Sequence, residues 1–317
     1  YMQTYVIRRL LQSIVVIILV SMVIFASLHL LPGDPFLAKQ GIQIGLTGED
    51  IAKLRAAAGL DKPIYLQYVI WAGNALRGDF GVSYYDQVEV SSLIALRLPA
   101  TLQLTVFAMT FALLIAIPLG IAAANRQNTI VDYIVTAIGT IGMSVPSFWL
   151  GIMLILVFSV QLGWLPAVGY VPFFDDPITN LKHIVLPCVT LGLVLIAPTM
   201  RFLRSSILEV KRQDYVQTAH AKGLSERNVV FGHILKNAMI PTLTVVGLQM
   251  GYLLGGSVVI EWVFGYPGLG QLVIDAIRLR DYGVVQATVM LFATGFILIN
   301  LLVDILYGAL DPRIRYA

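Results

Sequence analysis

Long apolar runs recur along the chain, and they constrain its fold more than any other feature. Runs of about 20 residues have the length that a helix needs to cross the hydrocarbon core of a bilayer. Of the 317 residues, 58% are hydrophobic and 12% are charged, whereas about a quarter of the residues of a soluble domain are charged. A water-soluble fold could not cover so much apolar surface, so lipid is the expected solvent for most of the chain.

Six segments have the hydropathy of transmembrane helices when the sequence is read in windows of about 19 residues. The predicted spans are residues 10–31, 102–124, 134–160, 184–203, 238–260 and 284–307. Each is long enough to cross a bilayer as a helix. We therefore expect an all-α, polytopic membrane protein with about six transmembrane helices.

The Lys and Arg residues are divided unevenly between the two sets of segments that alternate along the predicted spans. The set that includes both termini carries twelve cations and five acids, and the opposite set carries nine cations and twelve acids. Segments rich in Lys and Arg tend to stay in the cytoplasm. Because an even number of spans returns the chain to its starting side, we expect both termini to be cytoplasmic.

The spans divide the chain into four parts. Residues 2–31 are the first span with its cytoplasmic N-terminus, and residues 32–101 form an extracytoplasmic cap with a predicted helix near 49–59. Residues 102–307 form a core of five spans, which includes a cytoplasmic loop at 204–236. Residues 308–317 are a cytoplasmic tail.

The cytoplasmic loop contains the signals of two short helices. Asp214 is a candidate N-cap with Gln217 three residues later, and Gly223 stands where a left-handed C-terminal cap is expected. Ser225 can cap a second helix that runs from residue 226 to 239, with Pro241 opening the next span. Two short helices that meet at a glycine predict a protrusion of fixed shape, to which a partner protein could bind.

Small and polar residues mark two places inside the predicted spans. Gly247, Gly251 and Gly255 form a small-residue stripe that lets another helix approach closely, and we expect that helix to belong to a partner subunit. Gln249 lies on roughly the opposite face, where its amide either bonds to a neighbouring helix or faces a wet pathway.

The third predicted span is interrupted near its middle. Ser144, Pro146 and Ser147 lie there, and a proline opens the backbone hydrogen-bond ladder of a helix. One interpretation is a packing kink whose freed carbonyl is satisfied by a serine. The other is a bend that lines a translocation path.

Several function classes find little support in the sequence. Cys188 is the only cysteine, and the chain contains neither a phosphate-binding Gly-x4-Gly-Lys-Ser/Thr string nor a His-Glu-x-x-His motif. We therefore predict no catalytic residues, no metal site, no cofactor held by the chain itself and no nucleic-acid partner. Ionisable residues are also nearly absent from the predicted spans, which argues against an ion-coupled secondary carrier.

Short stretches spread over nearly the whole chain resemble one family of membrane proteins. They are Leu-Pro-Gly-Asp-Pro at 31–35, Gly-Asp-Phe-Gly-Val-Ser at 78–83, Pro-Ala-Thr-Leu at 99–102, Asp-Tyr-Val-Gln-Thr-Ala-His-Ala-Lys-Gly-Leu-Ser at 214–225, Asn-Ala-Met-Ile-Pro at 237–241, Phe-Gly-Tyr-Pro-Gly-Leu-Gly at 264–270 and Asp-Pro-Arg-Ile-Arg at 311–315. In this order they resemble the permease subunits of peptide-type ABC importers, in particular the B-subunit family of dipeptide and oligopeptide permeases.

The resemblance implies a type I importer fold in a bacterial inner membrane and a multi-subunit assembly. The expected partners are a second, similar permease, two ATP-binding subunits that hold ATP and Mg, an extracytoplasmic solute-binding protein and membrane lipid. The loop would then dock on the ATP-binding subunits. The docking residues that the resemblance implies are Asp214, Tyr215, Gln217, Thr218, Ala219, Ala221, Lys222 and Gly223.

The family leaves the solute open, since its members carry dipeptides, oligopeptides, glutathione, opines or nickel. Two other classes of function also remain to be tested. A secondary carrier would take up solute by itself with an ion gradient, and a membrane assembly factor or scaffold would move no solute with any partner.

Overall fold

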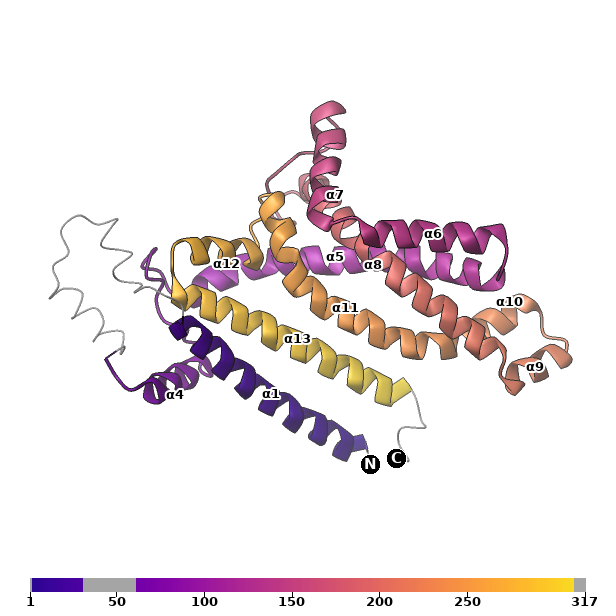
Figure 1. Ribbon diagram of the computed structural model, residues 1–317, viewed down its shortest axis with the longest axis horizontal. Helices are drawn as coiled ribbons and strands as arrows, with labels where there is room; N and C mark the ends of the chain where they lie inside the picture. Colours follow the sequence, from indigo (N-terminus) through magenta and orange to yellow (C-terminus); the bar gives the residue numbers. More distant parts are fainter. Residues whose placement is uncertain (1, 31–60, 311–317) are drawn as a thin grey trace.

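The architecture is that of a helical membrane protein. A computed structural model describes residues 2–30 and 61–310, which form helices joined by short loops (Figure 1), and within these ranges the only β pairing is an isolated bridge between Val82 and Glu89. In this part of the chain, five helices are long and apolar enough to cross a membrane, and a bent helix pair makes a sixth if it is counted as one span. The predicted all-α, polytopic fold is confirmed.

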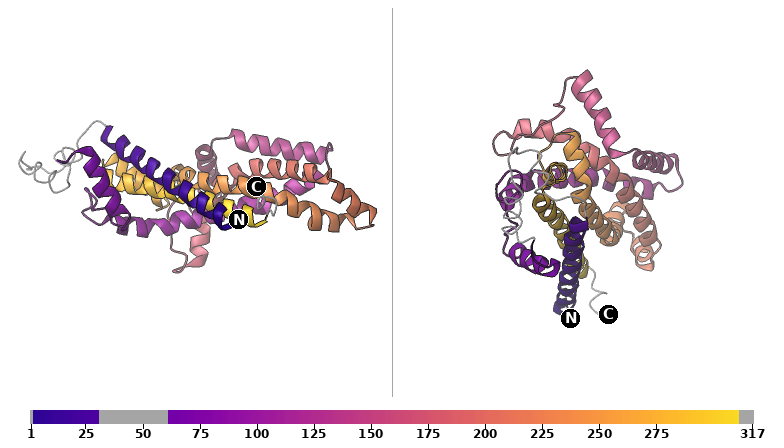
Figure 2. Two further views of the ribbon diagram at one scale, coloured as in Figure 1. Left: turned by 90° about the horizontal axis from the view of Figure 1, so that it is seen from below. Right: turned by 60° about the vertical axis from the view of Figure 1, so that its left-hand side comes forward.

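The N-terminal helix α1 (Met2–Leu30) lies alongside the last helix, α13 (Tyr282–Leu310), as the views of Figure 2 also show. Near the start of α1 and the end of α13, Arg9 Nη1 lies 3.2 Å from Asp304 Oδ2. The start of α1 and the end of α13 are therefore on the same side of the helical bundle.

A short helix that the sequence did not reveal, α4 (Ile64–Ala75), packs against the C-terminal half of α1. The rings of Tyr68 and Trp71 have centroids 5.5 and 6.0 Å from that of Phe25. The Tyr68 hydroxyl is 2.8 Å from Ser21 Oγ. The helix predicted near 49–59 lies outside the described residues.

Two helices extend well beyond the predicted spans, α5 (Val90–Asn125, 36 residues) and α8 (Pro177–Lys211, 35 residues). At about 1.5 Å per residue, each is longer than the bilayer core is thick. The first turns of α5, residues 90–101, lie in the segment expected to form the extracytoplasmic cap. Asp176 caps α8, because its Oδ1 accepts hydrogen bonds of 3.1 Å from the N–H groups of Ile178 and Thr179.

The third predicted span is broken rather than kinked. It consists of α6 (Ile130–Ser144), α7 (Ser147–Leu154) and the π-helix η1 (Ile155–Gln161), and the two parts are bent by 95°. Pro146 favours the break, since a proline disfavours helical geometry in the residue before it, and Val145 has φ −90° and ψ 125°. The Ser144 hydroxyl donates to the Thr140 carbonyl at 3.0 Å.

The loop after α8 and the fifth predicted span form one connected unit. The loop contains α9 (Asp214–Ala221) and α10 (Glu226–Val229), which continues through the π-helix η2 (Val230–Ile234) into α11 (Leu235–Val263). We expected Pro241 to separate the loop helix from the span, but the helix runs through it. Proline is tolerated within transmembrane helices because neighbouring groups satisfy the freed carbonyl.

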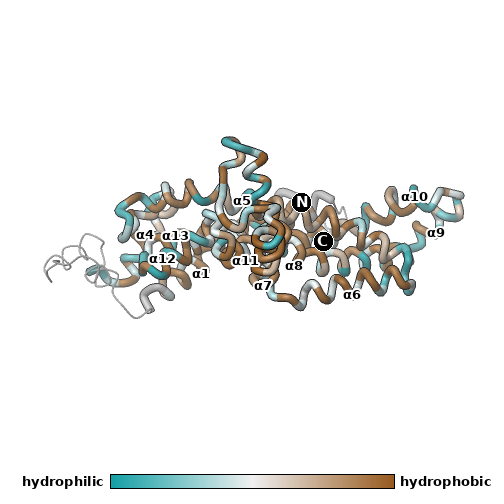
Figure 3. Tube along the Cα trace, turned by 90° about the horizontal axis from the view of Figure 1, so that it is seen from above, coloured by the Kyte–Doolittle hydropathy of each residue, from teal (hydrophilic) through white to brown (hydrophobic). Residues whose placement is uncertain are grey.

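The short helix α12 (Leu269–Arg278) follows α11 at the end of the bundle opposite α9 (Figure 1). The long helices contact one another in the order α5, α8, α11, α13 and α1. Figure 3 shows hydrophobic residues along them and hydrophilic residues at α9. Large apolar side chains such as Leu11, Leu114 and Ile138 are more than half exposed on the outside, as expected where lipid is the solvent.

Candidate functional site

The loop after α8 has the two-helix structure that the sequence predicted. Helix α9 ends before Gly223, which has φ +76°, and its N–H donates to the His220 carbonyl at 2.9 Å. The N–H of Leu224 donates to the Ala219 carbonyl at 3.3 Å, which closes the end of α9. The Ser225 hydroxyl then accepts a 3.4 Å hydrogen bond from the Asn228 N–H and caps α10.

The predicted start of α9 is wrong by one residue. Gln213 is the N-cap and makes no side-chain capping bond, whereas Asp214 is the first helical residue. The capping box of Asp214 with Gln217 is therefore not formed. An acidic residue in the first turn still interacts favourably with the positive end of the helix dipole.

The loop is attached firmly to the rest of the chain by apolar contacts. Val216 and Ala219 are 1% and 6% exposed, and they share a buried cluster with Leu203 and Ile207 near the end of α8. Val229 of α10 belongs to the same cluster. Apolar contacts therefore join α9 to the end of α8.

The outward face of the loop contains most of the residues singled out from the sequence. The exposed members of that set are Asp214, Tyr215, Gln217, Thr218, Ala221, Lys222 and Gly223. Ala219 differs because it faces the buried cluster. It positions the loop and cannot contact a partner directly.

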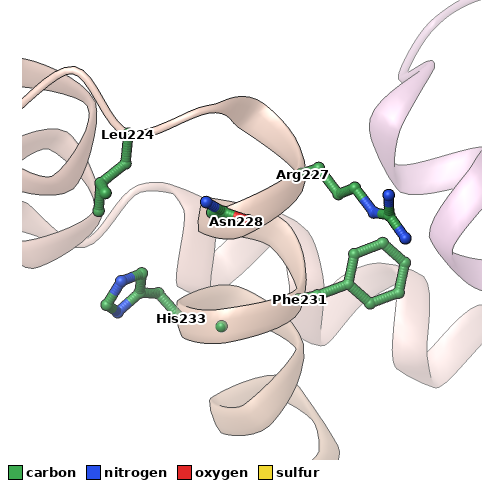
Figure 4. Close-up of a pocket in the computed structure, with 6 residues that line it drawn as sticks. Leu224, Arg227, Asn228, Phe231 and His233 are labelled. Carbon is green, nitrogen blue, oxygen red and sulfur yellow. The ribbon is translucent and has the colours of Figure 1, made fainter.

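An open pocket of about 420 Å³ adjoins the loop. The sequence did not predict it. Its walls come from α10, η2 and the turn before them, and Figure 4 shows Arg227 and Phe231 on one side of it and His233 on the other. Phe231 is 57% exposed although it lies in a polar loop. An exposed aromatic ring next to a cation provides a surface for a protein side chain.

The glycine stripe of α11 contacts a helix of the same chain. A Cβ atom on Gly247 would overlap Val303, and one on Gly251 would overlap the ring of Phe296, both on α13. We expected a partner subunit at this face, and for these two glycines that expectation is wrong because α13 occupies it. Gly255 has open space around it, so a role for Gly255 between subunits stays a prediction.

The polar residues of the predicted path lie in two places. Gln249 accepts a 2.7 Å hydrogen bond from the Thr199 hydroxyl, which joins α11 to α8 through its Oε1 atom. Its Nε2 atom is buried without a hydrogen-bond partner. Ser144, Pro146 and Ser147 lie at the break between α6 and α7. Neither observation tests whether these residues line a path.

Comparison with known families accounts for nearly the whole length of the chain. Residues 116–316 match the family described as "Binding-protein-dependent transport system inner membrane component", and residues 2–105 match the family of the N-terminal part of that membrane component. The chain belongs to this family. It is the permease subunit of an ABC importer and a multi-pass inner membrane protein, and the expected resemblance to peptide-type permeases is confirmed.

Individual relatives agree with this assignment. The permease is 45% identical, over 315 residues, to the glutathione transport system permease protein GsiC of Escherichia coli and to that of Salmonella choleraesuis. The match covers 99% of this chain and 100% of each relative.

Two crystal forms of the inward-facing MetNI methionine ABC transporter have the same fold. Their TM-scores are 0.57 and 0.56 at 20% and 21% sequence identity. Each match covers 69% of this chain and 96% of the matched transporter chain. The type I importer fold is thus confirmed.

A buried carboxylate at the end of the permease opposite α9 was missed from the sequence. Glu261 is fully buried, and its Oε1 accepts a 2.8 Å hydrogen bond from the Thr101 hydroxyl of α5. Its Oε2 accepts a 2.7 Å bond from the N–H of Gly270 in the first turn of α12. Glu261 therefore ties α5, α11 and α12 together. The signal was available as a single acid directly after the predicted span 238–260.

A second polar cluster lies at the same end of the permease. Tyr266 donates to Gln103 Oε1 at 3.3 Å, and Gln103 Nε2 donates to Asn180 Oδ1 at 2.6 Å. Asn180 Nδ2 donates to the Val171 carbonyl at 2.6 Å. Burial raises the pKa of the Tyr266 phenol, so the hydroxyl stays protonated and keeps its role as donor. These bonds connect α5, α8 and the segment that follows α11.

Proposed function

We propose that this permease forms, together with a second permease, the translocation path for a small peptide, and that glutathione is the first solute to test. The observation that carries the proposal is the 45% identity over 99% of the chain to permeases named for glutathione transport. Dipeptides, oligopeptides, opines and nickel are the alternatives within the family. The solute-binding protein would make most of the selection.

We also propose that two ATP-binding subunits dock on α9 and its exposed residues, and that they hold the ATP and Mg. Two features of the chain support this. The loop has a fixed shape set by Gly223 and Ser225, and it is joined to α8 through Val216 and Ala219. Closure of the ATP-binding subunits would thereby move α8 and change which side of the membrane the path faces.

Uptake into vesicles tests the solute and the class of transport together. The permease is reconstituted with its partner permease, ATP-binding subunits and solute-binding protein, and labelled glutathione, a dipeptide, an oligopeptide, an opine and nickel are compared. We expect ATP-dependent uptake that is greatest for glutathione. ATP-dependent uptake that is greatest for another solute would change the proposed solute and leave the proposed class of transport as it is. Uptake by this chain alone with an ion gradient would identify a secondary carrier, and no uptake of any solute would favour a scaffold.

Cysteine labelling tests the proposed orientation. Phe174 is 95% exposed near the start of α8, and Lys222 is exposed in the loop after α9. In a Cys188→Ala background, Phe174→Cys should react with an impermeant maleimide added outside intact cells. Lys222→Cys should react only after the membrane is opened. The reverse pattern would place both termini outside and exclude docking of cytoplasmic ATP-binding subunits at α9.

A further inference from the structure

Asp132 of α6 and Arg204 of α8 form a two-bonded ion pair near the cytoplasmic loop. Arg204 Nε lies 2.6 Å from Asp132 Oδ1, and Nη2 lies 2.6 Å from Oδ2. The Asn128 N–H donates a third hydrogen bond, of 3.0 Å, to Oδ2. Asp132 is only 3% exposed. The planar fork of an arginine holds a carboxylate in one geometry, which a lysine cannot do.

The ion pair fixes the register of a longer contact between the two helices. A Cβ atom on Gly139 of α6 would lie 2.8 Å from Met200 Cε and 3.3 Å from Ala197 Cβ of α8. Gly139 is two helical turns from Asp132, and Ala197 is two turns from Arg204, so both contacts lie on one face of each helix. The contact at Gly139 is apolar and would let the helices slide. Sliding at the ion pair would leave a buried carboxylate unpaired, which is costly.

Helix α8 connects this contact to the cytoplasmic loop. Leu203 and Ile207 lie on either side of Arg204 in the sequence, and both belong to the buried cluster that holds Val216 and Ala219 of α9. The last turns of α8 therefore contact the loop through apolar side chains and α6 through Arg204. A displacement of α9 passes to α8 and then to α6.

The break at Pro146 leaves α6 free to follow α8. Helix α7, on the other side of the break, contacts an earlier part of α8 and the residue that follows α11. A Cβ atom on Gly151 would lie 3.1 Å from Phe264 Cε2 and 3.4 Å from Thr190 Cγ2. With a 95° bend and non-helical backbone at Val145, α6 and α7 do not form one rigid rod.

We propose that the Asp132–Arg204 ion pair is the link through which movement of the cytoplasmic loop carries α6, so that α6, the end of α8 and α9 move as one body. This inference rests on the proposed function of the loop. Both residues are positioning residues, since they act through the helices that they join. Transport then requires movement of α6. Helix α9 does not move α6 directly and acts on it through α8 and the ion pair.

Variants of Arg204 test the link in the complete importer complex. Arg204→Gln should lower ATP-driven uptake about tenfold or more, while the assembled complex still hydrolyses ATP. Arg204→Lys should retain part of the uptake, because it keeps the charge and loses the fork. The matched control is Arg201→Gln, an exposed arginine one turn earlier on α8, which should transport normally. Equal uptake by the two glutamine variants would overturn the proposal.

A cross-link distinguishes joint movement from a purely structural role. Asp132→Cys with Arg204→Cys, in the Cys188→Ala background, is assembled in the complex and treated with a short bifunctional methanethiosulfonate. If the helices move together, the cross-link should restore uptake to within about threefold of the Cys188→Ala complex, and reduction should remove the gain. A cross-linked complex that hydrolyses ATP without transport would overturn the proposal. Absence of uptake by the Cys188→Ala complex itself would count against the proposed function instead.

Discussion

Replacing Gly223 with valine should abolish solute uptake and leave ATP hydrolysis uncoupled from transport. Gly223 has φ +76°, and a Cβ atom built there meets nothing within 4 Å. The restriction is therefore in the backbone and not in the space around it. A residue with a side chain is strained by about 1 kcal/mol or more in this conformation, and a β-branched residue is strained most. Valine would change the angle between α9 and α10 and so misplace the docking surface.

Three further variants show whether backbone conformation is the cause. Gly223→Asn should retain most of the transport, since asparagine adopts the left-handed conformation more readily than other residues, and Gly223→Ala should lie between asparagine and valine. Gly73→Val in α4, where a Cβ atom also has open space, should have little effect. Normal uptake by Gly223→Val at normal membrane abundance would show that the loop does not couple the subunits.

The features predicted correctly from the sequence depend on signals within one segment. Hydropathy identified the long helices, and Gly223 and Ser225 marked the end of α9 and the start of α10. In each case the physical cause lies within a few residues of its effect. The family resemblance extended this to the type I fold, which no local signal could specify.

The features that were missed or wrong depend on contacts between distant segments. Asp132 and Arg204 are 72 residues apart in the sequence, and Thr101 and Glu261 are 160 apart. Nothing local indicates such pairs. The third span was predicted in part. Pro146 indicated an irregularity in the helix, but the 95° bend depends on what α6 and α7 pack against. The glycine stripe was recognised correctly as a close contact, but its spacing alone could not identify the neighbouring helix.

The glycine stripe leads to the second large effect, which is expected from Gly251→Leu. Gly251 is buried against Phe296 of α13, and even a Cβ atom would overlap the ring. Insertion of a leucine must push α11 away from α13 or force Phe296 from its position, and overpacking of this kind costs about 1–3 kcal/mol or more. The permease should therefore show low membrane abundance and a lowered melting temperature in detergent, measured by thermal-shift fluorescence, even without its partner subunits.

A matched glycine and a compensating substitution separate contact within the chain from contact between subunits. Gly255→Leu places the same side chain one turn further along α11, where a Cβ atom meets nothing within 4 Å, so the isolated permease should keep its melting temperature. Gly251→Leu combined with Phe296→Ala should recover part of the lost stability, because the smaller residue makes room for leucine. If Gly251→Leu leaves the isolated chain unchanged and weakens only the assembled complex, the stripe faces a partner subunit after all. A loss of assembly with Gly255→Leu alone would assign that single glycine to the interface between permeases and leave Gly247 and Gly251 to α13.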